Sequence, residues 1–162
     1  MAHPSVSPEA FLQMGRDILA QQPFSGLLGA ELTALSPGVV ELQLPMRDAL
    51  RQQHGFAHGG VVSYLADNAL TYAGGTAMQV PVVTSEFKIN YVRPAVGERL
   101  VARARAEATG QAQSVARCEV YAVADGMGVF GDGGAPRAFA GFEEAVKIFS
   151  DMGHQRELAR TY

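Results

Sequence analysis

One carboxylate stands alone in the most apolar stretch of the chain, and it is the residue best placed to carry a reaction. Between His58 and Glu86, Asp67 is the only ionisable side chain apart from weakly acidic tyrosines. Burying an unpaired carboxylate costs free energy, so an acid at this position needs either a partner or a chemical role. A carboxylate in an apolar wall is a better general base or nucleophile than a solvated one. Asp67 is therefore the candidate reactive group, and a buried hydrogen bond at a subunit interface is its alternative role.

Two further features of the same stretch could assist a carboxylate. Thr71 follows Asp67 by four residues, so a helix would place both side chains on one face. Alternatively, the Thr71 hydroxyl could bond back to the helix backbone. Gly59 would begin that helix, and a backbone N–H at the positive end of a helix can stabilise an oxyanion. Gly59 is of interest for its backbone, since it has no side chain.

The stretch from residue 58 to residue 75 is expected to form one buried helix. From Val61 to Ala73, apolar residues recur at three- and four-residue spacing, which is typical of a helical face. Most other positions are also small or apolar, which favours burial within a globular protein. The stretch is too short, and too rich in flanking glycine, to span a bilayer. Gly59 and Gly60 are expected to let the chain turn into the helix.

Strands are expected on both sides of this helix, because apolar and polar residues alternate there between turn signals. A turn at residues 36–38 separates the first two strands, and Gly110 lies within a meander of three strands. A loop over residues 45–57 leads into the central helix, and loops of this kind often carry function. The expected strands are residues 26–35, 38–44, 82–92, 98–109 and 112–124, and residues 137–147 could close the sheet.

The expected elements make an α+β domain, in which an antiparallel sheet of five to six strands wraps a long central helix. An N-terminal amphipathic helix is expected over residues 8–22, with Ser7 as its cap and Pro8 in its first turn. We divide the chain into an N-terminal helical segment (1–25), the sheet-and-helix domain (26–149) and a polar C-terminal tail (150–162). The face that this N-terminal helix would bury carries Phe11, Met14, Ile18 and Leu19.

Composition narrows the class of protein. The 162 residues, 48% of them hydrophobic, suit one compact domain. The net charge of -3, with 13 Lys and Arg against 16 Asp and Glu, gives no reason to expect nucleic acid or an anionic membrane as partner. The single Cys118 cannot form an intramolecular disulfide and is expected to be an inert strand thiol. The first residues show no secretory signal, so a cytoplasmic location is expected.

Three familiar motifs do not fit this sequence. The run from Gly126 to Gly131 matches G-x-G-x-x-G, but residues 132–136 cannot open the helix that a phosphate site needs, so a hairpin tip is expected there. His54 and His58 lie in a glycine-containing loop without a nearby Cys, so no metal and no cofactor are expected. A Ser-His-Asp triad is not indicated either, because the chain has no G-x-S-x-G elbow.

The order of motifs along the chain resembles the hotdog-fold acyl-CoA thioesterases of the phenylacetate-pathway type. The resemblance extends from about residue 26 to about residue 146. It implies a central helix wrapped by an antiparallel sheet, and subunits that pair as homodimers or as dimers of dimers with active sites at the subunit boundary. The matching stretches are Gln52-x-x-Gly55-x-x-His58-Gly59-Gly60, Leu65-Ala66-Asp67-Asn68-Ala69 and Asn90-Tyr91-Val92-Arg93-Pro94-Ala95-x-Gly97.

The resemblance implies roles for individual residues. Asp67 matches the catalytic carboxylate, either as nucleophile or as the base that activates water, and Gly59 matches the glycine whose N–H polarises the thioester carbonyl. Gln52 stands where many relatives have Asn, and could supply a side-chain amide or merely cap the loop. Thr71 and Thr84 match hydroxyls that orient water in different members, which leaves the detailed mechanism open.

Substrate binding is expected to involve residues beside the helix start. His58 and Gly60 belong to the same motif, and His58 could alternatively be an inward hydrogen-bonding residue that shapes the loop. Arg93, and with it Arg51, would hold the phosphates of CoA, because arginine offers planar bidentate donors. Arg93 could instead be an ordinary solvated strand end. The residues considered for the acyl pocket are Phe56, Tyr64, Leu65, Tyr72 and Met78.

The function expected from these features is hydrolysis of an aryl- or medium-chain acyl-CoA to free acid and CoA. Two alternatives remain open. One is a non-catalytic hotdog protein that binds acyl-CoA, and the other is an acyl thioester hydratase or dehydratase, which needs a His paired with an acid. His58 and Asp67 lie nine residues apart, and the H-F-P pattern of the dehydratases is absent.

Overall fold

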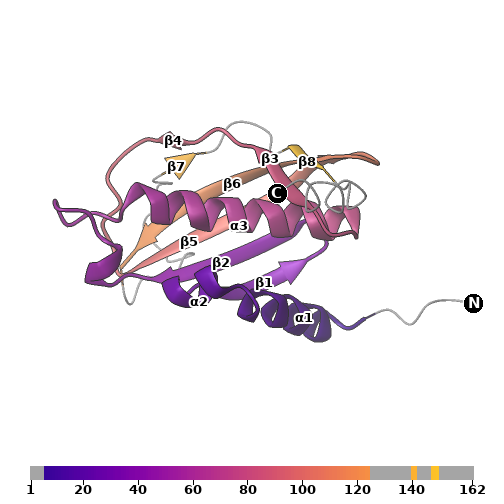
Figure 1. Ribbon diagram of the computed structural model, residues 1–162, viewed down its shortest axis with the longest axis horizontal. Coiled ribbons are helices and arrows are strands. Elements are labelled where there is room, and N and C mark those ends of the chain that lie inside the picture. Colours follow the sequence, from indigo (N-terminus) through magenta and orange to yellow (C-terminus); the bar gives the residue numbers. More distant parts are fainter. Residues whose placement is uncertain (1–5, 125–139, 142–146, 150–162) are drawn as a thin grey trace, which may run out of the picture.

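A long helix packed on one face of an antiparallel sheet dominates the computed structural model, which describes residues 6–124, 140–141 and 147–149 (Figure 1). The helix is α3 (Gly59–Met78), and its contacts are mainly with the central strands β2, β5 and β6. The expected α+β architecture with a long central helix is therefore confirmed. In spatial order the six strands are β1 (Glu31–Ser36), β2 (Val39–Pro45), β5 (Arg99–Thr109), β6 (Ser114–Val123), β7 (Ala140–Gly141) and β4 (Asn90–Tyr91).

The burial of α3 follows from its composition. Val62, Leu65 and Leu70 are at most 1% exposed, and they face the inner side of the sheet together with the alanines of the helix. The helix begins at an N-cap residue, His58, and ends at Gln79, whose left-handed backbone (φ 58°) stops it. Gly59 and Gly60 lie inside its first turn, and the positive φ in the preceding loop belongs to Gly55 instead. The turn into the helix is thus made four residues earlier than expected.

The pairing of the later strands differs from the expected meander. β5 pairs with β6, but its other neighbour is β2, and the chain before it does not join β5. The expected strand over residues 82–92 is divided into β3 (Val83–Glu86), which pairs with β8 (Lys147–Phe149), and β4, which pairs with β7. A three-strand meander is therefore wrong, because sequence alternation marks strands without naming their partners.

The N-terminal helical segment is longer than expected and buries only part of the expected face, since Leu19 is buried but Met14 and Ile18 are not. It comprises α1 (Pro8–Ala20) and α2 (Pro23–Leu28), so the first strand begins at Glu31 and not at residue 26. Met14 and Ile18 are each 54% exposed, and the buried positions of α1 are Gly15 and Leu19. Gly15 sets this orientation because a Cβ there would lie 2.6 Å from the side chains of Leu32 and Leu35. The glycine allows a close approach that apolar periodicity does not reveal.

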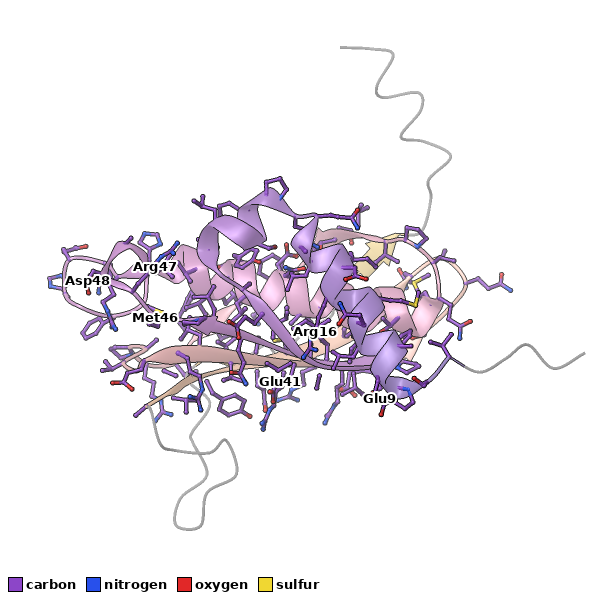
Figure 2. All side chains as sticks on the ribbon, turned by 90° about the horizontal axis from the view of Figure 1, so that it is seen from below. Glu9, Arg16, Glu41, Met46, Arg47 and Asp48 are labelled. Atoms are coloured by element: carbon purple, nitrogen blue, oxygen red, sulfur yellow. The ribbon has the colours of Figure 1, made fainter. Side chains whose placement is uncertain are left out.

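A loop with the 3-10 turn η1 (Asp48–Leu50) connects β2 to α3 at the end of the molecule opposite the N-terminus of α1. Figure 2 shows Met46, Arg47 and Asp48 in this loop, far from Glu9 on α1. Arg47 donates to the Leu27 carbonyl of α2, which ties the loop to the helical segment. The loop is therefore held at the point where it leaves β2.

Several expected features lie outside the described residues, namely the run from residue 126 to residue 131, the tail over residues 150–162 and most of residues 137–147. Within the described residues, no helix has the length and apolar character needed to cross a bilayer. Cys118 is buried in β6, and burial raises the pKa of its thiol above the ordinary value. A thiol held in its neutral form is a poor nucleophile, as expected for a structural cysteine.

A buried polar cluster attaches α2 to α3. The Asn68 side-chain amide donates to Gln22 Oε1 at 3.1 Å and to the Tyr64 hydroxyl at 3.1 Å. Tyr64 in turn donates to Ser25 Oγ at 2.6 Å, and Ser25 is only 1% exposed. Because these groups are shielded from water, each depends on the others for its hydrogen bonds.

We expect Asn68→Ala to lower the free energy of unfolding by about 1–3 kcal/mol, because it removes the hydrogen bonds that the Asn68 amide donates within this cluster. Urea denaturation of the purified protein would measure the change. Gln13→Ala removes an amide from the exposed side of α1, where Gln13 donates to Asp17, and should alter stability by less than about 0.5 kcal/mol. Equal stability of the Asn68 variant and wild type would contradict a stabilising role for the cluster.

Candidate active site

Asp67 lies on the half-buried side of α3, and two threonine hydroxyls surround it. Thr84 comes from β3 and donates to Asp67 Oδ1 at 2.7 Å. Thr71, one helical turn after Asp67, has its Oγ1 2.9 Å from the Asp67 carbonyl oxygen and 3.0 Å from Thr84 Oγ1. The structure therefore brings together three residues that the sequence places in two separate elements.

The number of available protons fixes the hydrogen-bond directions in this cluster. Thr84 uses its single hydroxyl proton on Asp67 Oδ1, so towards Thr71 it can only accept. Thr71 has one proton and two acceptors within reach, and its bond to the Asp67 carbonyl is the helix back-bond that the sequence leaves open. Asp67 Oδ2 meets no donor among the residues that the structure describes. One carboxylate oxygen is thus held, and the other is available for a reaction.

The start of α3 forms a second group of candidate residues. Gly60 N–H donates to His58 Nδ1 at 3.0 Å, and the Val61 and Val62 N–H groups donate to the His58 carbonyl at 2.9 and 3.3 Å. Of the first four N–H groups of the helix, only that of Gly59 lacks an acceptor within the described part of the chain. Gly59 thus presents an unused donor at the positive end of the helix. His58 is an exposed helix cap and not an inward residue.

Gln52 lies in a pocket next to this helix start. The pocket has a volume of about 390 Å³, and Gln52, Phe56, Gly59, Tyr91 and Arg93 are among the residues that line it. The Gln52 side-chain oxygen accepts from the His54 N–H at 2.7 Å, so the loop-capping role is present in the structure. Capping uses only the oxygen, and the side-chain NH₂ of Gln52 is left as the donor that a ligand could meet.

The two arginines proposed for phosphate binding occupy different surroundings. Arg51 donates to the Gly55 carbonyl at 3.0 Å and to the Gly97 carbonyl at 3.3 Å, and it lies 3.8 Å from Asp48. Its guanidinium therefore braces the loop that carries Gln52. Arg93 is exposed and lines the 390 Å³ pocket, which places it beside the entrance to the helix start.

The two groups of candidate residues are separated along the helix. Gly59 and Asp67 are eight residues apart in α3, which corresponds to about 12 Å along the helix axis. A carbonyl group cannot receive a hydrogen bond from Gly59 and be attacked beside Asp67 of the same chain, because both contacts need about 3 Å. Within the described residues of one chain, Gly59 and Asp67 therefore cannot act on the same carbonyl group.

A larger hollow, about 600 Å³, lies on the other side of the sheet around Glu41 (labelled in Figure 2) and Arg103. Burial acts to raise the pKa of Glu41, but hydrogen bonds from Arg103, Thr33 and Gln43 outweigh it and leave that pKa below its ordinary value. The 2.8 Å bond between Arg103 and Glu41 belongs to this surface network. None of the expected site residues lines this hollow.

Two further residues, Tyr91 and Ser63, lie at the start of α3, although their pattern in the sequence did not single them out. Tyr91 lines the pocket, and its hydroxyl lies 2.9 Å from the Gly59 carbonyl and 2.7 Å from Ser63 Oγ. In the sequence, Tyr91 reads as an apolar member of an alternating strand. The signal in the sequence that could have drawn attention to Tyr91 is its place in the matching stretch from Asn90 to Gly97. Of the acyl-pocket candidates, Leu65 and Tyr72 are instead buried in the core.

Comparison with known proteins identifies a family. Residues 54–128 match the model of the family described as the thioesterase superfamily. A thioesterase family protein from Silicibacter pomeroyi has a solved structure that is 39% identical, with a TM-score of 0.74, and the match covers 86% of this chain and 98% of that chain. The phenylacetic acid degradation protein PaaI of Thermus thermophilus is 28% identical with a TM-score of 0.63, covering 79% of this chain and 98% of that one.

A curated relative is a protein of Deinococcus radiodurans with the provisional name of an esterase. It is 34% identical over 98 residues, which are 60% of this chain and 66% of that protein. The chain thus matches slightly less than two thirds of this relative's length. The solved structures above also confirm the expected hotdog fold. The matched residues 54–128 include Gly59, Asp67, Thr71 and Thr84.

Proposed function

Because this chain belongs to the thioesterase superfamily, we propose that it hydrolyses the thioester bond of an acyl-CoA to a free acid and CoA. The observation that carries the proposal is the Asp67 carboxylate, which accepts from Thr84 at Oδ1 and meets no donor at Oδ2 among the described residues. Water oxygen adds to the carbonyl carbon, the carbon–sulfur bond breaks, and the water proton ends on the sulfur of CoA. Asp67 either takes that proton as general base or attacks first as nucleophile, in which case water hydrolyses the anhydride formed.

In this proposal Gly59 and Gln52 stabilise the negative charge that develops on the carbonyl oxygen. The Gly59 N–H lacks an acceptor among the described residues, and it lies at the positive end of α3. The Gln52 NH₂ lines the same pocket while its oxygen is occupied by His54. Preformed donors of this kind typically contribute a factor of about 10²–10³ to kcat each. Thr71 and Thr84 would orient the carboxylate and the attacking water.

A complete site then needs two chains. The separation of about 12 Å between Gly59 and Asp67 in one helix would be bridged if Asp67 of one subunit met Gly59 and Gln52 of another. In a two-fold dimer this arrangement occurs twice, because the same two surfaces contribute to both sites. We therefore propose a homodimer, or a dimer of dimers, as the active form.

We also propose that the acyl group is an aryl or medium-length chain, as for a thioesterase of the phenylacetate-pathway type. The similarity to the phenylacetic acid degradation protein of Thermus thermophilus supports this choice. The pocket beside Gln52 has an apolar lining of Phe56, Val62, Val92, Pro94 and Ala95. Such a lining suits an uncharged group more than a polar one.

A panel of acyl-CoAs, with free thiol as the measured product, would test the proposed function. Release of CoA from aryl- and medium-chain substrates is the expected result. Enoyl or hydroxyacyl products would indicate a hydratase or dehydratase, and binding without turnover would indicate a non-catalytic protein. The structure gives no support to the hydratase, because His58 Nδ1 accepts from Gly60 and no carboxylate partners His58 within the described residues.

Arg93→Ala is expected to raise KM for acyl-CoA roughly fivefold while kcat changes little, because an exposed charge pair with phosphate contributes at most about 1 kcal/mol. Steady-state kinetics on the best substrate of the panel would measure it. Arg105→Ala is the matched control, since Arg105 is an exposed arginine paired with Glu107 on β5, outside the pocket. An unchanged KM for the Arg93 variant would leave Arg93 as an ordinary strand-end residue. Arg51 is better explained as a brace for the loop.

A further inference from the structure

A chain of hydrogen bonds links the start of α3 to β4. Ser63 Oγ lies 2.7 Å from the Tyr91 hydroxyl oxygen, which lies 2.9 Å from the carbonyl oxygen of Gly59. Tyr91 also lines the pocket that contains Gly59 and Gln52. The Tyr91 ring also covers Gly59 closely, since a Cβ on that glycine would lie 3.4 Å from the Tyr91 hydroxyl.

The direction of this chain follows from the proton count. A carbonyl oxygen only accepts, so the single phenolic proton of Tyr91 must go to Gly59. The Tyr91 oxygen can then only accept from Ser63, which makes Ser63 the donor. The peptide group continues the chain, because its N–H belongs to Gly60 and donates to His58 Nδ1. The order is therefore Ser63, Tyr91, the Gly59–Gly60 peptide and His58.

This chain of hydrogen bonds acts on a glycine, the residue type with the least intrinsic backbone restraint, in the first turn of α3. Glycine has no side chain to limit its backbone angles, so the direction of the Gly59 N–H depends on what holds the neighbouring peptide groups. The Gly59–Gly60 peptide is held at its carbonyl by Tyr91 and at its N–H by His58. The Gly59 N–H belongs to the preceding peptide, His58–Gly59, whose carbonyl accepts from Val61 and Val62. With the peptides on both sides of the Gly59 Cα held, the Gly59 N–H is the one donor of the first turn that has no acceptor within the described residues.

We propose that Tyr91 is a positioning residue of the active site, whose hydroxyl holds the Gly59 backbone so that its N–H points at the reacting carbonyl oxygen. This role rests on the proposed thioesterase function. Tyr91 does not donate to the substrate itself, because its one proton is used on Gly59. An oxyanion donor contributes most when its direction is fixed before the reaction, since it then needs no reorganisation.

Tyr91→Phe tests this role, because it removes the hydroxyl and keeps the ring against Gly59. We expect kcat to fall about tenfold, less than the factor for deleting a donor, with KM changed by less than about twofold. Tyr121→Phe is the matched control. It removes the same group from β6, where Tyr121 donates to Glu119 on the outer side of the sheet, and should leave kcat unchanged.

A second measurement separates positioning from a general loss of structure. In ¹⁵N-labelled protein, the Gly59 amide resonance should shift and its hydrogen exchange should become faster in Tyr91→Phe, while the resonances of β5 and β6 stay in place. A kcat within about twofold of wild type, or an unchanged Gly59 amide, would overturn the proposal. If wild type hydrolysed no acyl-CoA, the proposed function would fail, and the amide measurement alone would still decide the role of Tyr91.

Ser63→Ala provides a coupling test, because it removes the donor to Tyr91 and leaves Tyr91 in place. Its effect on kcat should have the same direction as that of Tyr91→Phe and be smaller. The double variant should lose little more than Tyr91→Phe alone, because residues in one hydrogen-bond chain are not additive. Fully multiplicative losses would show that Ser63 and Tyr91 act independently, which would overturn the chain.

Discussion

Asp67→Asn should lower kcat for acyl-CoA hydrolysis about a hundredfold or more while the fold and acyl-CoA binding persist, because the variant loses its general base or nucleophile. Asparagine is nearly isosteric with aspartate. Its amide oxygen can still accept the hydroxyl of Thr84, so the side chain keeps the same support at the Oδ1 position. An amide NH₂ replaces the open oxygen, and it can neither take a proton nor attack carbon.

Turnover at saturating substrate, sedimentation and thermal unfolding should be measured on one preparation. Asp17→Asn is the matched control, because Asp17 is an exposed acid on α1 that accepts from Gln13. If Asp67 were only a hydrogen-bonding group at a subunit interface, the variant would lose thermal stability or the dimer, with turnover per folded protein little changed. Retained turnover in Asp67→Asn would remove the case for hydrolysis at this site.

Mixing two inactive variants should restore activity if two chains share each site. Asp67→Asn and Gln52→Ala are each expected to be nearly inactive alone, because every site of either homodimer lacks one component. After unfolding and refolding an equal mixture, about half the dimers should be mixed, and each of these has one intact site of two, which gives about a quarter of wild-type activity. The expected rise is therefore from near zero to about a quarter of the wild-type rate.

Two controls accompany the mixing experiment. Each variant refolded alone must stay inactive. A refolded mixture of tagged and untagged Asp67→Asn must also stay inactive. Sedimentation of wild type should show a dimer or a dimer of dimers. A fully active monomer, or a mixture no more active than its parts, would exclude a site shared between chains.

Some features of this protein could be predicted from its sequence because they depend on local order. The buried helix from Gly59 onward follows from apolar residues on nearly all its sides, and the hairpin at Gly38 follows from a turn that needs a positive φ, observed here as 78°. Asp67 stands out because a lone acid in an apolar helix is costly. Gly59 and Gln52 came from a motif of fixed spacing, and the structure brings both to one pocket.

Other features depend on contacts between residues far apart in the chain, and only the tertiary structure decided them. The pairing of β5 with β2 could not be predicted, because alternation in a strand specifies which face is buried and not which strand lies beside it. Gly15, and not Met14 or Ile18, faces the sheet because a close approach needs the absence of a side chain.

The hydroxyl groups near Asp67 and Gly59 are also of two kinds: one could be placed from the sequence, and the others only from the tertiary structure. The position of Thr71 beside Asp67 follows from helical spacing, because residues four apart in a helix share a face. Thr84 is 17 residues from Asp67 in the sequence, and Tyr91 is 32 residues from Gly59. These pairs are in contact only because β3 and β4 lie along α3. Sequence spacing determines which residues share one element, while packing between elements determines which of them touch.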